Sequence, residues 1–268
     1  MSPDHDDFGG ISRDLPRLLG RRRVLGLLAG AGALAVAGCT TGTTGATPTT
    51  ASTAGSATGA STASGQIPQE TGGPFPADGS NGPNVLDDAG IVRSDIRSSF
   101  GSSTTTAQGV PLRIELTLTD TAGAAMAGAA VYVWHCDRDG NYSLYSRGAG
   151  GENFLRGVQA ADATGKVAFT SIFPACYSGR WPHVHFEVYR SLGDATSSGN
   201  AVRTSQLALP RAVCEQVYAT AGYSASVRTL AQVSLDSDNV FRDGYDRQLA
   251  TVTGDVSGGY TAALPVAV

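Results

Sequence analysis

The clearest alternation of apolar and polar positions runs from Leu112 to Thr119, where the sequence reads LRIELTLT. A repeat of two is typical of a strand with one buried face, because successive side chains point to opposite sides. Other segments are rich in β-branched and aromatic residues and are bounded by turn residues, so we predict strands there too. These segments are Ala129 to Trp134, Lys166 to Phe173, Val184 to Tyr189, Gln248 to Val256 and Gly259 to Val268.

Helical periodicity is confined to Arg211 to Thr220, with a further short turn near Ser226. Short strands at regular spacing, joined by glycine-rich turns, are typical of a β-sandwich or barrel. The pattern therefore predicts a mainly β domain over residues 68–268, with an antiparallel β-sandwich core and few short helices.

The start of the chain has a different pattern. A basic cluster, Arg21 to Arg23, precedes an apolar run from Val24 to Ala37 that is too short to span a bilayer permanently. This order predicts a signal peptide over residues 1–38. Its arginines resemble a twin-arginine (Tat) export signal, and AVAGC resembles a lipoprotein cleavage site ending at Cys39. We expect an exported protein that is lipid-anchored outside the cell membrane through acylated Cys39.

Residues 39–67 consist almost entirely of threonine, serine, glycine and alanine after the cysteine. Such a segment buries too little apolar surface to offset the entropy lost on ordering. We therefore predict a flexible, disordered linker between the membrane anchor and the folded domain.

Composition changes this picture in two ways. Only 16% of the 268 residues are charged, which is less than the quarter that is usual in soluble domains, and much of this shortfall lies in the signal and the linker. Without these two segments about 200 residues are left, so we predict one domain rather than two. The formal net charge of −4 argues against a nucleic-acid partner, which would require a basic face.

Two histidines share one strand face in the segment RWPHVHF. Residues two apart in a strand point to the same side, so His183 and His185 place two imidazoles next to each other. Paired imidazoles are a common metal-binding arrangement. Tyr177 precedes His183 by six residues, and Tyr142 follows the predicted strand ending at Trp134. These neighbours favour a metal site over a pair of surface histidines.

Four segments together resemble the intradiol ring-cleavage dioxygenases, relatives of catechol and protocatechuate dioxygenases. The similarity extends over nearly all of residues 68–268 and is nearest to the exported single-chain branch of that family. The segments read ETGGPF (70–75), WHCDRDGNYSLYS (134–146), NFLRGVQAADATGKVAFTSIFPACYSGRWPHVHFEVY (153–189) and SDNVFRDG (237–244).

The resemblance implies a non-haem iron cofactor, one Fe(III) per chain, held by two tyrosinates and two histidines. The implied ligands are Tyr142 and His183 in equatorial positions and Tyr177 and His185 in axial positions. Phenolate oxygens suit ferric iron, a hard and highly charged ion. Tyr145 remains an alternative to Tyr142 as a ligand.

The resemblance also implies a reaction: cleavage of small catechol-type aromatic diols with O2 to cis,cis-muconate products. In this mechanism the substrate displaces Tyr177, which gives that ligand a catalytic role as well. Arg180 matches an arginine that stabilises charge on the substrate. Gln159 resembles a glutamine near the substrate, and we expect His135 to be structural.

Three cysteines lie in the predicted domain: Cys136, Cys176 and Cys214. An exported protein can hold disulfides, and the sequence does not choose among the three possible pairings. We favour Cys176 with Cys214, because Cys214 lies in the predicted helix.

A function of a different class stays open: a catalytically silent β-sandwich lipoprotein that binds aromatic or glycan ligands. Such a relative should have lost at least one of the four implied ligands, and this chain retains all four together with Arg180. A copper or zinc protein is a further alternative, which the two tyrosines weaken. The preferred ring substituents and the oligomeric state are not determined by the sequence.

Overall fold

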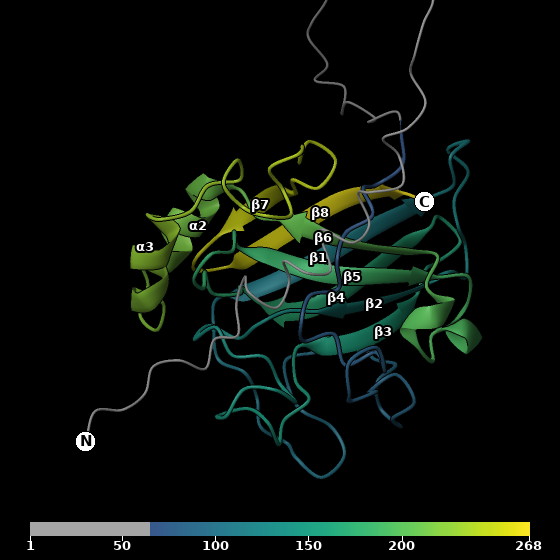
Figure 1. The fold of residues 1–268 in the computed structure, drawn as a ribbon, viewed down its shortest axis with the longest axis horizontal. Helices are drawn as coiled ribbons and strands as arrows, with labels where there is room; N and C mark the ends of the chain where they lie inside the picture. Colours follow the sequence, from purple (N-terminus) through teal and green to yellow (C-terminus); the bar gives the residue numbers. More distant parts are fainter. Residues whose placement is uncertain (1–64) are drawn as a thin grey trace, which may run out of the picture.

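The computed structural model describes residues 65–268. The predicted signal peptide, Cys39 and nearly all of the predicted linker lie outside the described residues. The described chain forms two four-stranded sheets, ordered β4-β1-β8-β7 and β3-β2-β5-β6, packed as a sandwich (Figure 1). The strands are β1 (Pro111–Thr119), β2 (Ala130–Trp134), β3 (Arg156–Ala160), β4 (Lys166–Ile172), β5 (His183–Tyr189), β6 (Arg203–Ala208), β7 (Thr251–Asp255) and β8 (Gly259–Ala267). The mainly β fold predicted from the sequence is confirmed.

The strand pairs are antiparallel with one exception. β1 and β8 run parallel from Leu112 opposite Tyr260 to Thr119 opposite Ala267. The first sheet is therefore mixed, whereas the second sheet, which carries the candidate site, is antiparallel throughout. Two of the observed strands, β3 and β6, are not among the strands predicted from the sequence.

Helices α2 (Arg211–Tyr218) and α3 (Ser224–Leu230) lie together at one end of the sandwich (Figure 1). Their positions agree with the helix and the turn that we predict from the sequence. Two short 3-10 helices, η1 (Leu192–Asp194) and η2 (Ser198–Asn200), lie between β5 and β6. Among the described residues no helix has the length and apolar character needed to cross a membrane.

The two sheets bury a common apolar core between them. In β1 the alternation seen in the sequence becomes an alternation of buried and more exposed side chains. All residues of β2 and β5 are buried, because a second apolar cluster covers the outer face of their sheet. Part of that cover is the segment 70–81, which we call the strap. The candidate site lies between the strap and this outer sheet face.

The last residue of the predicted linker lies among the described residues. Ile67, placed in the linker by composition, is 2% exposed and belongs to the core between the sheets. Its backbone N–H donates to the carbonyl of Ala267 in β8. The last residue of the predicted linker is therefore packed against the sandwich.

The three cysteines of the domain are buried and free. The Sγ atom of Cys176 lies 3.5 Å from the carbonyl oxygen of Arg180, and that of Cys214 lies 3.9 Å from the carbonyl oxygen of Leu209. The Cys176–Cys214 pairing that we favour from the sequence is thus not formed, and the core holds these thiols without a bridge.

Candidate metal centre

Strand β5 brings His183 and His185 to the outer face of its sheet. The alternate residues Val184 and Phe186 point the other way, into the core between the sheets. The two imidazoles, each 2% exposed, approach so closely that their Nε2 atoms are 3.0 Å apart. The pairing predicted from the sequence spacing is therefore present.

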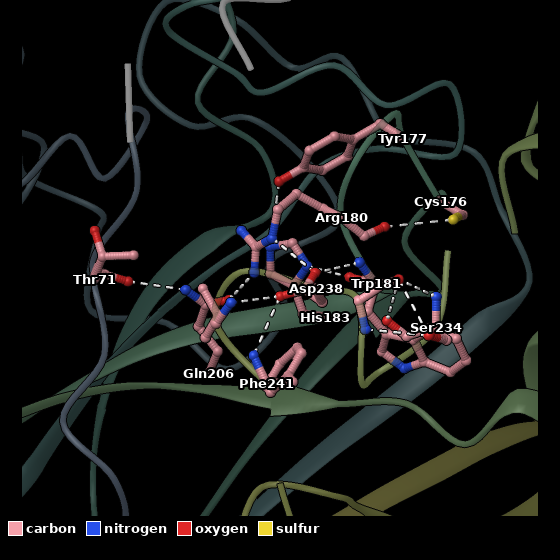
Figure 2. A network of polar contacts seen from close by, with 12 residues as sticks. Thr71, Cys176, Tyr177, Arg180, Trp181, His183, Gln206, Ser234, Asp238 and Phe241 are labelled. Atoms are coloured by element: carbon pink, nitrogen blue, oxygen red, sulfur yellow. Dashed lines mark hydrogen bonds and ion pairs between the residues drawn. The ribbon is translucent and has the colours of Figure 1, made fainter. Parts of the chain in front are cut away.

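Two tyrosines complete the group. Tyr142 lies in the loop after β2, and its hydroxyl oxygen is 3.3 Å from that of Tyr177. Tyr177 lies in the loop before β5, and its hydroxyl oxygen is also 3.3 Å from the Nε2 atom of His183. In Figure 2 the Tyr177 ring points toward His183. The structure thus brings together all four predicted ligands, which come from three segments of the chain.

The spacing of the four donor atoms fits a metal ion. Atoms bound about 2.0–2.1 Å from one metal are roughly 3.0–3.4 Å from their neighbours in the coordination shell. The neighbouring donors here are 3.0 and 3.3 Å apart. The described residues contain no group of three histidine, cysteine, aspartate or glutamate side chains able to hold a metal. A metal at this place would therefore depend on the phenol oxygens.

Burial keeps the two histidines and the Tyr142 hydroxyl uncharged. It lowers the pKa of His183 to about 3 and the pKa of His185 well below its ordinary value. It also raises the pKa of the Tyr142 hydroxyl well above its ordinary value. Neutral imidazoles are ready to bind a cation, and a bound cation is the kind of partner that favours an ionised phenol.

The two histidine rings are held in different ways. His183 donates its Nδ1–H to the carbonyl of Trp181, the kind of hydrogen bond that fixes the orientation of a metal-binding histidine. His185 stacks on Trp134, with ring centroids 4.9 Å apart and an interplanar angle of 5°. Its Nδ1 atom has no hydrogen-bond partner among the described residues, so packing fixes this ring.

Arg180, another predicted site residue, lies next to the donors. Its Nε–H donates to Asp238 at 3.0 Å, and an Nη2–H donates to the amide oxygen of Gln206 (Figure 2). Burial alone lowers the pKa of a guanidinium, but the Asp238 carboxylate raises the pKa of Arg180 above its ordinary value. Arg180 therefore remains a cation beside the two phenols.

The predicted role of Gln159 does not agree with the structure. Gln159 lies in β3 opposite Val131, a core residue, so its side chain is on the sheet face away from His185. Gln206 lies directly opposite His185 in β6 instead. Its amide accepts from Arg180 and donates to the carbonyl of Thr71 in the strap. Gln206 is not among the site residues predicted from the sequence, because it follows the polar residues Arg203, Thr204 and Ser205 and no local pattern marks it.

The alternative ligand Tyr145 faces the strap. Its hydroxyl donates to Asn81 and accepts from the backbone N–H of Ala77, both at 2.8 Å. His135 is buried and bonds to Ser171 and to the carbonyl of Cys136. Both side chains are engaged in these hydrogen bonds, which is consistent with the structural role that we predict for His135.

The chain is similar in sequence to known dioxygenases. Residues 81–193, which include the four donors and Arg180, match the family model described as Dioxygenase. A chlorocatechol 1,2-dioxygenase from Rhodococcus opacus is 36% identical over 66 residues, which cover 25% of this chain and 26% of the relative. A catechol 1,2-dioxygenase 2 from Acinetobacter lwoffii is 39% identical over 56 residues, 21% of this chain and 20% of the relative. The matched part thus spans only about a quarter of either curated relative.

The fold has solved counterparts. An intradiol ring-cleavage dioxygenase from Tetranychus urticae superimposes with a TM-score of 0.59 at 22% identity, covering 76% of this chain and 94% of that one. The dioxygenase domain of a carbohydrate-binding fusion protein from Streptomyces sp. SirexAA-E gives a TM-score of 0.50 at 19% identity, covering 76% and 98%. These similarities extend over most of the described domain.

Proposed function

The chain belongs to the intradiol ring-cleavage dioxygenase family, and on this premise we propose that it is a ferric-iron enzyme that opens catechol-type rings with O2. The observation that carries the proposal is the convergence of two imidazole nitrogens and two phenol oxygens at spacings of 3.0 to 3.3 Å. Few sites offer two phenols to one ion, and phenolate oxygens suit hard ferric iron better than copper or zinc.

The residues that would hold the iron are Tyr142, Tyr177, His183 and His185. When bound, ferric iron draws electron density from a coordinated diol and makes the ring reactive toward O2. The sheet fixes both histidines, and burial excludes water from the imidazoles and from Tyr142. The protein thereby supplies a rigid, dry donor set on the strap side of the sheet.

Tyr177 has the role of the ligand that exchanges for substrate. It is partly exposed, whereas the other three donors are 2% exposed, and it lies in a loop rather than in a strand. If a diol took its place, the phenolate oxygen of Tyr177 would accept one of the two hydroxyl protons of the diol. The second diol proton would pass to solvent.

Arg180 stabilises the negative charge that develops on the bound diol. Its guanidinium is held by Asp238 and Gln206, so it does not have to reorganise when that charge forms. The carboxylate of Asp238 offsets the charge of Arg180 when no substrate is bound. Together these residues provide a preorganised cation next to Tyr142 and Tyr177.

The overall reaction adds both atoms of O2 to the diol and breaks the carbon–carbon bond between the two hydroxylated carbons. For catechol the product is cis,cis-muconate, an open-chain dicarboxylate. Oxygen consumption by the iron-loaded full chain with catechol, protocatechuate and hydroxyquinol, together with identification of the product, tests this proposal. Stoichiometric uptake with a ring-opened diacid supports it. An iron-loaded protein that binds these diols without consuming oxygen supports the silent-lipoprotein alternative instead.

We also propose that the protein is exported and anchored by lipid at Cys39, as its first residues predict. The predicted linker would then carry the domain away from the membrane. Cys39→Ala tests this proposal, because the variant should move from the membrane fraction to the soluble fraction. An unchanged membrane fraction would contradict the lipid anchor.

A further inference from the structure

Three residues other than glycine have a positive φ angle within the described chain. They are Ala77 at 53°, Leu144 at 70° and Leu155 at 58°. Side chains with a Cβ atom rarely adopt this conformation, and it persists where the surrounding structure enforces it. The three residues belong to three separate segments: the strap, the loop of Tyr142 and the start of β3.

One side chain connects these three strained segments. Arg156 directly follows Leu155, and its Nη2–H groups donate to the carbonyls of Phe75 and Ser143, both at 2.9 Å. Its Nη1–H groups donate to the carbonyl of Pro76 and to the hydroxyl of Tyr132, both at 3.0 Å. Pro76 precedes Ala77, and Ser143 precedes Leu144, so each strained residue is next to a partner of Arg156 or to Arg156 itself.

The guanidinium is saturated by these contacts. Its remaining N–H, on Nε, donates to the Ser143 hydroxyl at 2.9 Å, so all five donors of Arg156 are used. The Ser143 hydroxyl in turn donates to the carbonyl of Phe154 at 2.7 Å, which joins the loop to the residue before Leu155. Arg156 is 1% exposed, and no shorter or single-donor side chain could bridge the same set of acceptors.

These contacts lie next to the candidate metal centre without touching its donor atoms. Ser143 directly follows Tyr142, and the ring of Phe75 packs on the ring of Tyr142 with centroids 5.0 Å apart. In the sheet Arg156 pairs with Trp134, the residue on which His185 stacks. Arg156 therefore bonds both to the loop that supplies Tyr142 and to the backbone of Phe75, whose ring packs against Tyr142.

We propose that Arg156 is the positioning residue of Tyr142: it clamps the strap to the Tyr142 loop and so fixes that phenol toward the metal. This inference rests on the proposed function, because Tyr142 is a ligand only if the site holds iron. In this proposal the strained conformations of Ala77 and Leu144 serve to place one ligand, Tyr142.

The test isolates Tyr142 spectroscopically. In full-chain protein carrying Tyr177→Phe, Tyr142 is the single remaining tyrosinate, so the visible tyrosinate-to-iron absorption band reports on it alone. Adding Arg156→Met should shift this band, reduce its intensity at least twofold and weaken ferric-ion binding about 10- to 100-fold. Arg156→Lys keeps the charge without the planar fork and should give an intermediate result.

Arg93 provides the matched control. It also donates to backbone carbonyls, those of Ser98, Asn153 and Arg156, but to none in the strap or the Tyr142 loop. Arg93→Met should lower the thermal midpoint while the absorption band stays in place. If Arg156→Met likewise lowers only the thermal midpoint, the positioning role is wrong.

Two further measurements keep the outcome decisive. If Arg156→Met does not fold, Ser143→Ala removes only the hydroxyl contacts. This variant should shift the band in the same direction but by less, and an unchanged band would overturn the proposal.

If even the parent protein with Tyr177 intact shows no band, the proposed function fails. Hydrogen exchange of the metal-free protein then tests whether Arg156 clamps the strap to the Tyr142 loop. Arg156→Met should speed amide exchange both in the strap and in residues 142–146, and unchanged exchange in these segments would refute the clamp.

Discussion

The Cε1 atom of His185 lies 3.3 Å from the position that a Cβ atom on Gly73 would occupy. Gly73 has a φ of +71°, so the strap passes over the imidazole with its backbone at the closest approach. The strap thus forms the wall of the candidate site beside His185. Glycine is required at position 73 for two reasons: its φ is positive, and a Cβ atom there would crowd the imidazole.

Gly73→Ala should therefore weaken iron binding as well as stability. A matched control is Gly123→Ala, because Gly123 has a similar φ of +86° but no atom within 4 Å of the place where a Cβ would stand. Both variants should lose roughly 1–2 kcal/mol of unfolding free energy to the left-handed conformation, as measured by urea unfolding. Only Gly73→Ala should also lower ferric-ion affinity, by about tenfold. Equal ferric affinities in the two variants would contradict the contact with His185.

The paired histidines should be required for iron, and the third histidine of the domain should not. His183→Ala removes a nitrogen donor and should reduce bound iron, measured by elemental analysis, at least tenfold. His135→Gln is the control, since His135 is equally buried but bonds to Ser171 and a backbone carbonyl. Full iron occupancy in His183→Ala would show that the donor cluster is not the metal site.

The buried ion pair between Arg180 and Asp238 should stabilise both the fold and the site. Their side chains are 7% and 0% exposed, and Asp238 also accepts the backbone N–H of Trp181 at 2.6 Å. Asp238→Asn leaves a buried guanidinium without its counter-charge, which typically costs about 3–5 kcal/mol of unfolding free energy.

The exposed pair of Arg97 and Asp95 is the matched control for this change. Its side chains are 42% and 51% exposed, so Asp95→Asn should cost less than about 1 kcal/mol in the same urea titration. A similar small loss for Asp238→Asn would mean that the Arg180 guanidinium is not held by this carboxylate.

Glu70 in the strap should make stability depend on pH. Burial, and then the nearby carboxylates of Asp243 and Asp238, raise its pKa from 4.5 to about 7, against the opposing effect of Arg180. Between these values folded Glu70 keeps its proton and unfolded Glu70 loses it, so unfolding releases a proton. The free energy of unfolding should therefore fall as pH rises from 4.5 to about 7, by at most about 1.4 kcal/mol per pH unit.

Glu70→Gln should remove this contribution. Urea unfolding at several pH values between 4.5 and 7 measures it as the difference in slope between the two proteins. Identical slopes would show that Glu70 titrates in the folded protein as it does in the unfolded chain.

The strands that could be predicted are those in which burial on one face, or on both, produces a visible pattern. LRIELTLT alternates because β1 has one face in the core and the other partly exposed. β3 and β6 were missed because RGVQA and RTSQLA mix polar and apolar residues on both faces. The parallel pairing of β1 with β8 joins the two ends of the domain, and no local pattern in either strand records its partner.

In the candidate site, too, local patterns predict some contacts and not those that depend on the pairing of distant segments. His183 and His185 share one strand, so their spacing alone predicts that they meet. Tyr142 and Tyr177 come from loops, so their spacing does not predict that they meet, and their roles as ligands were implied by the resemblance to a family. Gln206 reaches the site through strand pairing across from His185, which explains why a glutamine chosen from a local motif, Gln159, was the wrong one.

The most direct test of the proposed ring cleavage is the product that the iron-loaded protein forms from catechol under 18O2, analysed by mass spectrometry. Cleavage between the two hydroxylated carbons predicts cis,cis-muconate with one labelled oxygen atom in each of its two new carboxyl groups. Unlabelled product, a ring opened beside rather than between the hydroxylated carbons, or unchanged catechol in the presence of bound iron would contradict it.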